Sequence, residues 1–434
     1  MAASARARFL RWLAITLAVM TVIAGAAILV GQRVLRERVE LARERMNSEP
    51  PTAPGPARLE GEDPTAWLLA IDEAEPQEEL EVPEECADAE EDARIALSGE
   101  SRRFSAWNLA EPDPISGCKL AILRAQVASA APQLELARQV GRYGALRMPD
   151  LATTQEEFAP LHPSGMPTAI ALVRILSESA TLAAADGDSS RALADLRLAR
   201  RAIRLLDERD SSIVWLAVRF TRGIWVNALT RLAQWLPPEV DLSEFHSEFE
   251  GTDPWQVLEA SMLSDRRIIL GWISSLRQAA SSDFAPGPMM LGHQAWLDHE
   301  ETLLLDAYSA ALEGARAHRA PPWYEKVNQQ PWNRLFCMAA PPARNNHDAL
   351  LASEAFRLLT LGILIARRDG PKAAVEWTAL QVDPYSGRPL RFRRDGDVLF
   401  LWSIGPNGVD DNGSFVPAGN DELPPDAVVS IRVR

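Results

Sequence analysis

The chain has 434 residues, a hydrophobic content of 47% and a formal net charge of −15. This length and composition are typical of a protein with one or two folded domains. Residues 60–92 contain fifteen acidic residues and no basic one, so this single segment accounts for the whole net charge. Phosphate backbones are bound by clustered Lys and Arg, so the distribution of charge argues against a nucleic-acid partner.

An uncharged apolar stretch lies near the N-terminus. Residues 12–31 read WLAITLAVMTVIAGAAILVG and follow three arginines. Twenty helical residues span about 30 Å, the thickness of a bilayer core, which predicts a transmembrane helix embedded in the lipid bilayer. The alternative is a cleaved signal peptide with a site near Ala24-Gly25-Ala26, but the apolar stretch continues beyond that point.

The charges around this stretch leave the membrane orientation open. Five arginines follow it and three precede it, and by the positive-inside rule this excess places the C-terminal side in the cytoplasm. The later arginines alternate with glutamates at helical spacings over residues 32–46, which indicates a charged helical stalk. Prolines then predict an extended linker that continues into the acidic segment.

Most of the remaining chain has helical periodicity. Apolar residues recur every three or four positions from Lys119 to Arg368, with helices expected near residues 168–185, 189–206, 213–236, 255–280, 293–318 and 350–368. The first two of these should form an αα-hairpin around Asp186-Gly187-Asp188. Regularly spaced tryptophans such as Trp215 and Trp225 are expected to pack in the core.

The helical pattern ends at Gly370-Pro371 and a β pattern begins. Residues 389–393 and 398–404 read as strands that are joined at Asp395-Gly396, a strong hairpin signal. We therefore divide the chain into a tail (1–11), a transmembrane helix (12–31), a stalk (32–46), a Pro-rich and acidic linker (47–92), an α-helical domain (93–370) and a β-hairpin tail (371–434). The predicted fold class is mainly α, with an irregular αα-hairpin ectodomain and a small antiparallel β-hairpin module.

The last fifty residues resemble a known family. Asp383-Pro384, Gly387 and Pro389 precede the hairpin, and Leu401-Trp-Ser-Ile-Gly-Pro-Asn-Gly408 follows with Asp410 and Asp411. This arrangement is similar to the C-terminal region of type II secretion pseudopilins. The overall layout resembles single-pass bacterial envelope proteins that combine a helical ectodomain with such a tail. A pilin signal has a Gly that is followed by an apolar residue and, five positions on, by a Glu. No such pattern precedes the apolar stretch of this chain.

The resemblance implies a Ca²⁺ loop, because the corresponding loop of major pseudopilins binds this ion. Asp410 and Asp411 would be its charged ligands, and Asn407 and Asn412 its neutral ligands. The loop does not fit an EF-hand, since Gly408 falls at the first ligand position and Gly419 at the position of the bidentate Glu. A turn without metal is the alternative.

No familiar catalytic motif is present. The chain lacks the phosphate-binding, nucleophile-elbow and zinc-protease patterns. His293 and His299 would lie about 120° apart on a helix, which does not suit one metal ion. Cys337 and His347 flank a Pro-rich connector with nothing to orient a base. Three widely spaced cysteines allow at most one disulfide within the chain.

We expect a non-enzymatic interaction or scaffold protein in the bacterial inner membrane, with its C-terminal domain in the periplasm and an unidentified protein partner. One alternative is an accessory pseudopilin-like component of a secretion apparatus. Another is an envelope hydrolase without a recognisable motif.

Overall fold

A computed structural model describes residues 33–34, 37, 39–41, 59–74, 86, 108–109, 112–147, 163–249, 253–283, 288–318, 343–413 and 426–433. The predicted transmembrane helix (12–31), the N-terminal tail and most of the stalk and linker lie outside these residues. The chain divides into two compact units. One contains residues 1–53, 151–157 and 262–341. The other, here called the main unit, contains residues 54–150, 158–261 and 342–434.

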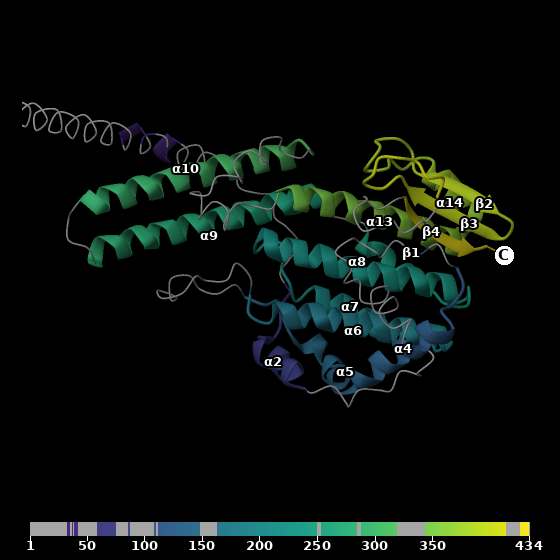
Figure 1. Cartoon of the computed structure of the whole chain (residues 1–434). Coiled ribbons are helices and arrows are strands. Elements are labelled where there is room, and N and C mark those ends of the chain that lie inside the picture. The colour runs from purple at the N-terminus through teal and green to yellow at the C-terminus, as the bar shows by residue number, and fades with distance from the viewer. Residues whose placement is uncertain are drawn as a thin grey trace, which may run out of the picture. The chain divides into compact units, whose positions relative to one another are not determined.

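The main unit is built on an αα-hairpin. Helices α6 (Met166–Ala185) and α7 (Ser189–Ile203) lie side by side, as the periodicity predicts (Figure 1). Asp188 caps α7 by accepting a hydrogen bond from the Arg191 amide at 3.0 Å. Such a cap satisfies one of the donors that every helix start leaves open.

Two longer helices pack beside this hairpin. Helix α8 (Ser212–Trp235) contacts both α6 and α13 (Ala343–Asp369). The Ser211 hydroxyl caps α8 by accepting from the Val214 amide at 3.1 Å. Trp215 and Trp225 are buried, which confirms their predicted core position. Shorter helices complete the layer: α2 (Thr65–Glu73), α4 (Gly117–Ser129), α5 (Ala131–Ala137), η3 (Val140–Arg142) and η4 (Ser243–Glu248).

The chain does not leave the helical pattern where the sequence indicates. After α13 a further helix, α14 (Pro371–Thr378), follows, so the predicted end of helix at Gly370-Pro371 is wrong. Gly370, with a φ of 90°, ends α13, and Pro371 begins α14. Proline is favourable at the first helical position because the amide hydrogen it lacks has no helical partner there.

The C-terminal strands form a sheet, which is larger than the predicted hairpin. Strands β2 (Arg391–Asp395) and β3 (Val398–Ser403) pair antiparallel, with Asp395 opposite Val398 across a two-residue turn. Strand β4 (Ala427–Arg432) pairs antiparallel with β3, and β1 (Asn108–Leu109) pairs parallel with β4. The hairpin is thus confirmed as one part of a sheet in the order β1-β4-β3-β2. Its two turn residues are Gly396 and Asp397, one position beyond the predicted Asp395-Gly396.

One hydrophobic core joins the sheet to the helices. Leu399, Leu401 and Val429 belong to the same buried cluster as the residues of α6, α7, α8 and α13. A Cβ atom built on Gly362 of α13 would lie 2.5 Å from the Leu401 Cδ1. A larger residue at this position would require the end of the Leu401 side chain to shift. The tail is a component of the main unit, not a separate module.

The second unit contains most of α9 (Pro254–Asp283) and α10 (Pro288–Arg316). Both helices begin and end within a few residues of the expected positions. Buried side chains such as Leu304 and Tyr308 line α10. Arg277 forms ion pairs with α10, including one at 2.6 Å to Glu301.

Two described helices, Met166–Ala185 and His347–Asp369, are long and apolar enough to span a membrane. Two thirds of the apolar window of each is buried within the protein, with 67% burial in both cases. Core helices of soluble domains have the same properties, so these helices support membrane association only weakly.

Candidate functional site

The predicted Ca²⁺ loop lies directly after β3. Asp410 is the most constrained of its residues. Its Oδ1 accepts hydrogen bonds from the Trp402 indole at 3.1 Å and the Asn412 amide at 3.0 Å, and its Oδ2 pairs with Arg391 at 3.1 Å. Burial raises the pKa of Asp410, but these donors outweigh it and hold the pKa below its ordinary value.

The other three predicted ligands lie in the same loop. The side-chain amide of Asn407 donates a hydrogen bond to Asp411 Oδ2 at 3.0 Å. Asn412 adopts a left-handed conformation with a φ of 58°, and its carbonyl accepts from Arg393 at 2.8 Å. The structure therefore brings the four residues together, with oxygens of Asp410, Asp411 and Asn412 accepting hydrogen bonds from protein groups.

A third carboxylate, which the sequence analysis did not single out, lies against this loop. Asp426 is buried and accepts a hydrogen bond from the Gly413 amide at 2.8 Å. Burial is the main cause that raises the pKa of Asp426 to about 6, and the charges of Asp410 and Asp411 add to it. Only long-range pairing of β4 with β3 brings Asp426 here.

Asp426 predicts a pH dependence of stability. The unfolded chain binds this proton with a pKa near 3.9, so the folded chain binds it more tightly. Protonation of Asp426 therefore raises the free energy of unfolding as the pH falls from about 6 to about 4, and this contribution is lost above pH 6. We expect Asp426→Asn to stabilise the chain at pH 8 by roughly 1–3 kcal/mol and to have little effect at pH 4. Chemical denaturation at both pH values checks this, with exposed Asp72→Asn as control; equal effects at both values would contradict it.

In this arrangement a Ca²⁺ ion would have to displace the Arg391 side chain from Asp410. The described residues contain no group of three or more His, Cys, Asp or Glu placed to hold a metal. Ca²⁺ binding stays a prediction, and thermal unfolding with millimolar Ca²⁺ tests it. A ligand that binds the folded state raises the melting temperature. A rise in the melting temperature of the wild type that is absent in Asp411→Asn would support Ca²⁺ binding. An unchanged melting temperature of the wild type would favour a turn without metal.

Neither of the two candidate pairs, His293 with His299 and Cys337 with His347, is described in full by the structure. His299 lies on α10 in one unit, and His347 lies on α13 in the main unit, where its ring is 5.7 Å from that of Trp255. The side chain of His293 and all of Cys337 lie outside the described residues. No described contact joins these groups into a catalytic pair.

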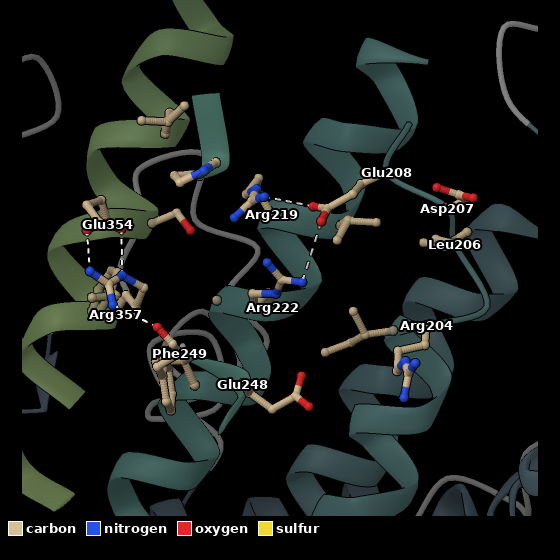
Figure 2. A pocket seen from close by; sticks show the side chains of 18 of the residues that line it. Arg204, Leu206, Asp207, Glu208, Arg219, Arg222, Glu248, Phe249, Glu354 and Arg357 are labelled. Atoms are coloured by element: carbon tan, nitrogen blue, oxygen red, sulfur yellow. Dashed lines mark hydrogen bonds and ion pairs between the residues drawn. The ribbon is translucent and has the colours of Figure 1, made fainter. Parts of the chain in front are cut away.

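The main unit contains a pocket with a volume of about 570 Å³, within the range of small-ligand sites. Its walls come from the end of α7 and the following loop, α8, the η4 region, the start of α9, and α13 (Figure 2). Phe249, Phe356 and Leu350 provide part of an apolar wall. The charged lining residues are Arg204, Asp207, Glu208, Arg209, Arg219, Arg222, Glu248, Asp253, Glu354 and Arg357.

Glu208 and Arg219 form the deepest ion pair of the pocket. Arg219 Nη2 lies 2.8 Å from Glu208 Oε2, and the Arg219 side chain is only 8% exposed. The guanidinium also lies 5.3 Å from the centre of the Trp215 ring, a cation–π distance. Burial lowers the pKa of Arg219 to about 10, so this side chain stays charged at neutral pH.

Burial also disfavours the charged form of Glu208, but two arginines overcome this effect. Arg219 and then Arg222 hold the pKa of Glu208 below its ordinary value. A second ion pair joins Glu354 and Arg357 on α13 at 2.5 Å, and Arg357 also donates to the Phe249 carbonyl at 2.9 Å. Two contacts thus hold the walls of the pocket together. The Glu208–Arg219 ion pair joins the loop after α7 to α8, and the Arg357–Phe249 hydrogen bond joins α13 to the η4 region.

The charged groups of the pocket suit binding better than proton transfer. The described residues that line it include no His, Cys, Lys or Tyr. A general acid or base needs a pKa near the working pH, and the pairing of Glu208 moves its pKa the other way.

Comparisons of the chain with models of protein families, with curated proteins and with solved structures found no match.

Proposed function

We propose that this chain is a non-enzymatic, membrane-anchored protein of the bacterial envelope, whose helical domain binds another protein. The pocket of the main unit carries this proposal. It combines apolar walls with charges that are preorganised by mutual pairing, as in recognition sites. The membrane anchor would be residues 12–31.

The test is affinity purification of the full chain from envelope membranes in detergent. Ser353 lines the pocket, and Ser353→Trp should fill it. Wild type is expected to retain a discrete protein that the variant loses, while circular dichroism verifies that both are folded. Recovery of no partner, together with a hydrolytic activity of the purified chain, would contradict the proposal.

An extracytoplasmic location is supported by a disulfide. Cys86 and Cys118 are bonded, with their Cα atoms 5.2 Å apart, and link the acidic segment to the start of α4. Disulfides persist in oxidising compartments such as the periplasm and are rare in the cytoplasm. The proposed orientation therefore follows the disulfide, although the count of arginines points the other way.

Thiol labelling of the denatured chain tests this orientation. Pairing of two of the three cysteines predicts one maleimide–polyethylene glycol adduct before reduction and three after it. The chain must be trapped with acid in growing cells so that its redox state is preserved. Three adducts without reduction would place the main unit in a reducing compartment.

The pseudopilin-like tail favours a second function, as an accessory component of a secretion apparatus. Both halves of its motif meet at Asp383, whose carboxylate accepts from the Ser403 hydroxyl at 2.6 Å and the Ile404 amide at 3.2 Å. Residues that are 20 positions apart thus form one turn structure. An alkaline-phosphatase fusion after Arg434 should be active under this alternative, and an inactive fusion would exclude it.

A further inference from the structure

Strand β2 has a neighbouring strand on one side only. It lies at the end of the sheet order β1-β4-β3-β2, and all of its residues after Arg391 are exposed. Asp395 and Val398 flank the two-residue turn and form the first hydrogen-bonded pair, and such pairs alternate along an antiparallel ladder. The backbone groups of Phe392 and Arg394 therefore point away from β3. On that side they form no hydrogen bond with the residues that the structure describes.

Just before this open edge, the same side of the chain has a backbone partner. Leu390 is two positions from Phe392, so its amide also points away from β3, and it donates to the Gln381 carbonyl at 3.0 Å. Before Gln381 the chain lies in α14, so this partner segment ends there and the edge from Phe392 to Arg394 stays open. Leu380 beside the opening is 79% exposed, and Phe392 is 41% exposed. An open strand edge with exposed apolar side chains is a surface on which another strand can pair.

The arginines of β2 that precede the opening are held on one face of the sheet. Arg391 pairs with Asp410 at 3.1 Å, and the guanidinium of Arg393 lies 5.0 Å from the centre of the Phe400 ring. Arg394 is exposed at the opening and forms no ion pair with the described residues, and its Nε donates only to a backbone carbonyl of the turn at 3.1 Å. The edge therefore presents one cation without a carboxylate beside exposed apolar groups.

The chain itself contains a segment whose side chains match this edge. Residues 75–85 lie outside the described residues, read EPQEELEVPEE and contain six Glu and no basic residue. Between the two prolines, Glu79-Leu80-Glu81-Val82 alternates acidic and apolar residues, which is the pattern of a strand with one apolar face. Neighbouring strands are stabilised by opposite charges and by apolar pairs. The glutamates complement Arg394, and the apolar residues complement Phe392.

This segment is fixed at both ends within its own chain. The Ala74 carbonyl accepts a hydrogen bond from Gln133 of α5 at 3.4 Å, and Cys86 is bonded to Cys118 at the start of α4. In Figure 1, helices α6, α7 and α8 lie between α4 and α5 on one side and β2 on the other. Because both ends of an eleven-residue segment lie on one side of this helical layer, the β2 edge of a second copy is more accessible to it than that of its own chain.

We propose that residues 77–82 of one copy pair, as an added strand, with the β2 edge of a second copy of this chain. The proposal goes beyond the pocket-based function, because it concerns contacts between copies of the chain and not the unidentified partner. The predicted anchor at residues 12–31 would hold such copies in one membrane plane.

Isotope-coded photo-crosslinking of the full chain in detergent tests the inference. One preparation is unlabelled and carries p-benzoylphenylalanine in place of the exposed Leu380, which leaves β2 unchanged. The other is labelled with ¹⁵N and carries no photoprobe. The two preparations are mixed and irradiated, and mass spectrometry identifies the crosslinked peptides. We expect the probe of the unlabelled copy to be joined to ¹⁵N-labelled residues 75–85.

Charge reversal provides a second measurement. Arg394→Glu in the probe-bearing copy should lower the yield of this crosslink roughly fivefold or more, because like charges would then face each other. Glu79→Arg with Glu81→Arg in the labelled copy should restore much of the yield. Arg267→Glu is the matched control and should leave the yield unchanged, since Arg267 is exposed on α9 in the other compact unit. Circular dichroism and an unchanged melting temperature verify that each variant is folded.

Crosslinks that join the probe only to unlabelled residues 75–85 would place the segment on its own chain and overturn the inference. So would the absence of any crosslink to residues 75–85, or an equal yield from Arg394→Glu. Capture of a partner by the pocket is measured separately with Ser353→Trp, so the inference and the proposed function can fail independently.

Discussion

Replacing Asp383 with alanine is expected to destabilise the main unit by roughly 3–5 kcal/mol, because several buried donors lose a charged acceptor at once. The carboxylate is fully buried and accepts from the Tyr385 amide at 3.1 Å and the Ser386 hydroxyl at 2.8 Å. It also accepts from Ser403 and Ile404 at the end of β3. Its loss should release the turn before β2 from the end of β3.

Urea denaturation measures this loss, and hydrogen exchange should show the greatest deprotection in β2 and β3. Asp395→Ala is the control, since Asp395 lies exposed at the hairpin and its ion pair with Arg393 is exposed as well. Exposed pairs contribute less than about 1 kcal/mol. Equal destabilisation by the two substitutions would show that Asp383 does not hold the turns together.

Arg219→Met should cost roughly 3 kcal/mol or more, because Glu208 would stay buried without its closest partner. Arg222 lies 3.8 Å from Glu208, so it compensates only partly for the lost positive charge. The double variant Arg219→Met with Glu208→Leu should recover most of the loss, since an apolar pair of similar volume carries no desolvation cost. The same denaturation experiment measures both variants.

Arg138→Met provides the comparison for this pair. Arg138 pairs with Glu135 on the surface and its side chain is 67% exposed, so the expected change is below about 1 kcal/mol. If the double variant were as unstable as the single one, the Glu208–Arg219 pair would matter through packing and not through charge.

The helices could be predicted well because their signals are local. Apolar spacing and cap residues such as Asp188 and Ser211 mark α7 and α8, and these signals depend only on residues within one or two turns. The β2–β3 turn is equally local, since Gly396 with a φ of 61° fits the two-residue hairpin. Short-range chemistry thus determined most of the elements.

The sheet could be predicted only in part. Strand β1 has two residues and pairs with β4 across more than 300 positions of sequence. No local pattern carries such a pairing, because its free energy comes from the partner strand. The role of Asp383 has the same origin, since its distant partners Ser403 and Ile404 meet it only once β3 is formed.

The pocket was missed for a similar reason. Most of its residues come from three distant segments, around 203–226, 247–254 and 350–357, and Leu59 and Ala145 come from two more. Arg204 reads in sequence as part of a solvated helix face. One signal was present: Arg219 follows Trp215 by four positions, so it occupies the same apolar face of α8. A charged residue within a core stripe indicates a buried partner.

Photo-crosslinking in living cells tests the protein-binding role of the pocket most directly. A p-benzoylphenylalanine is placed at Ser247, which is exposed and lines the pocket, and separately at Lys372, whose side chain is 91% exposed on α14. Our account predicts a discrete crosslinked protein from position 247 and none of that size from position 372. The same products from both positions, or no product from position 247, would contradict it.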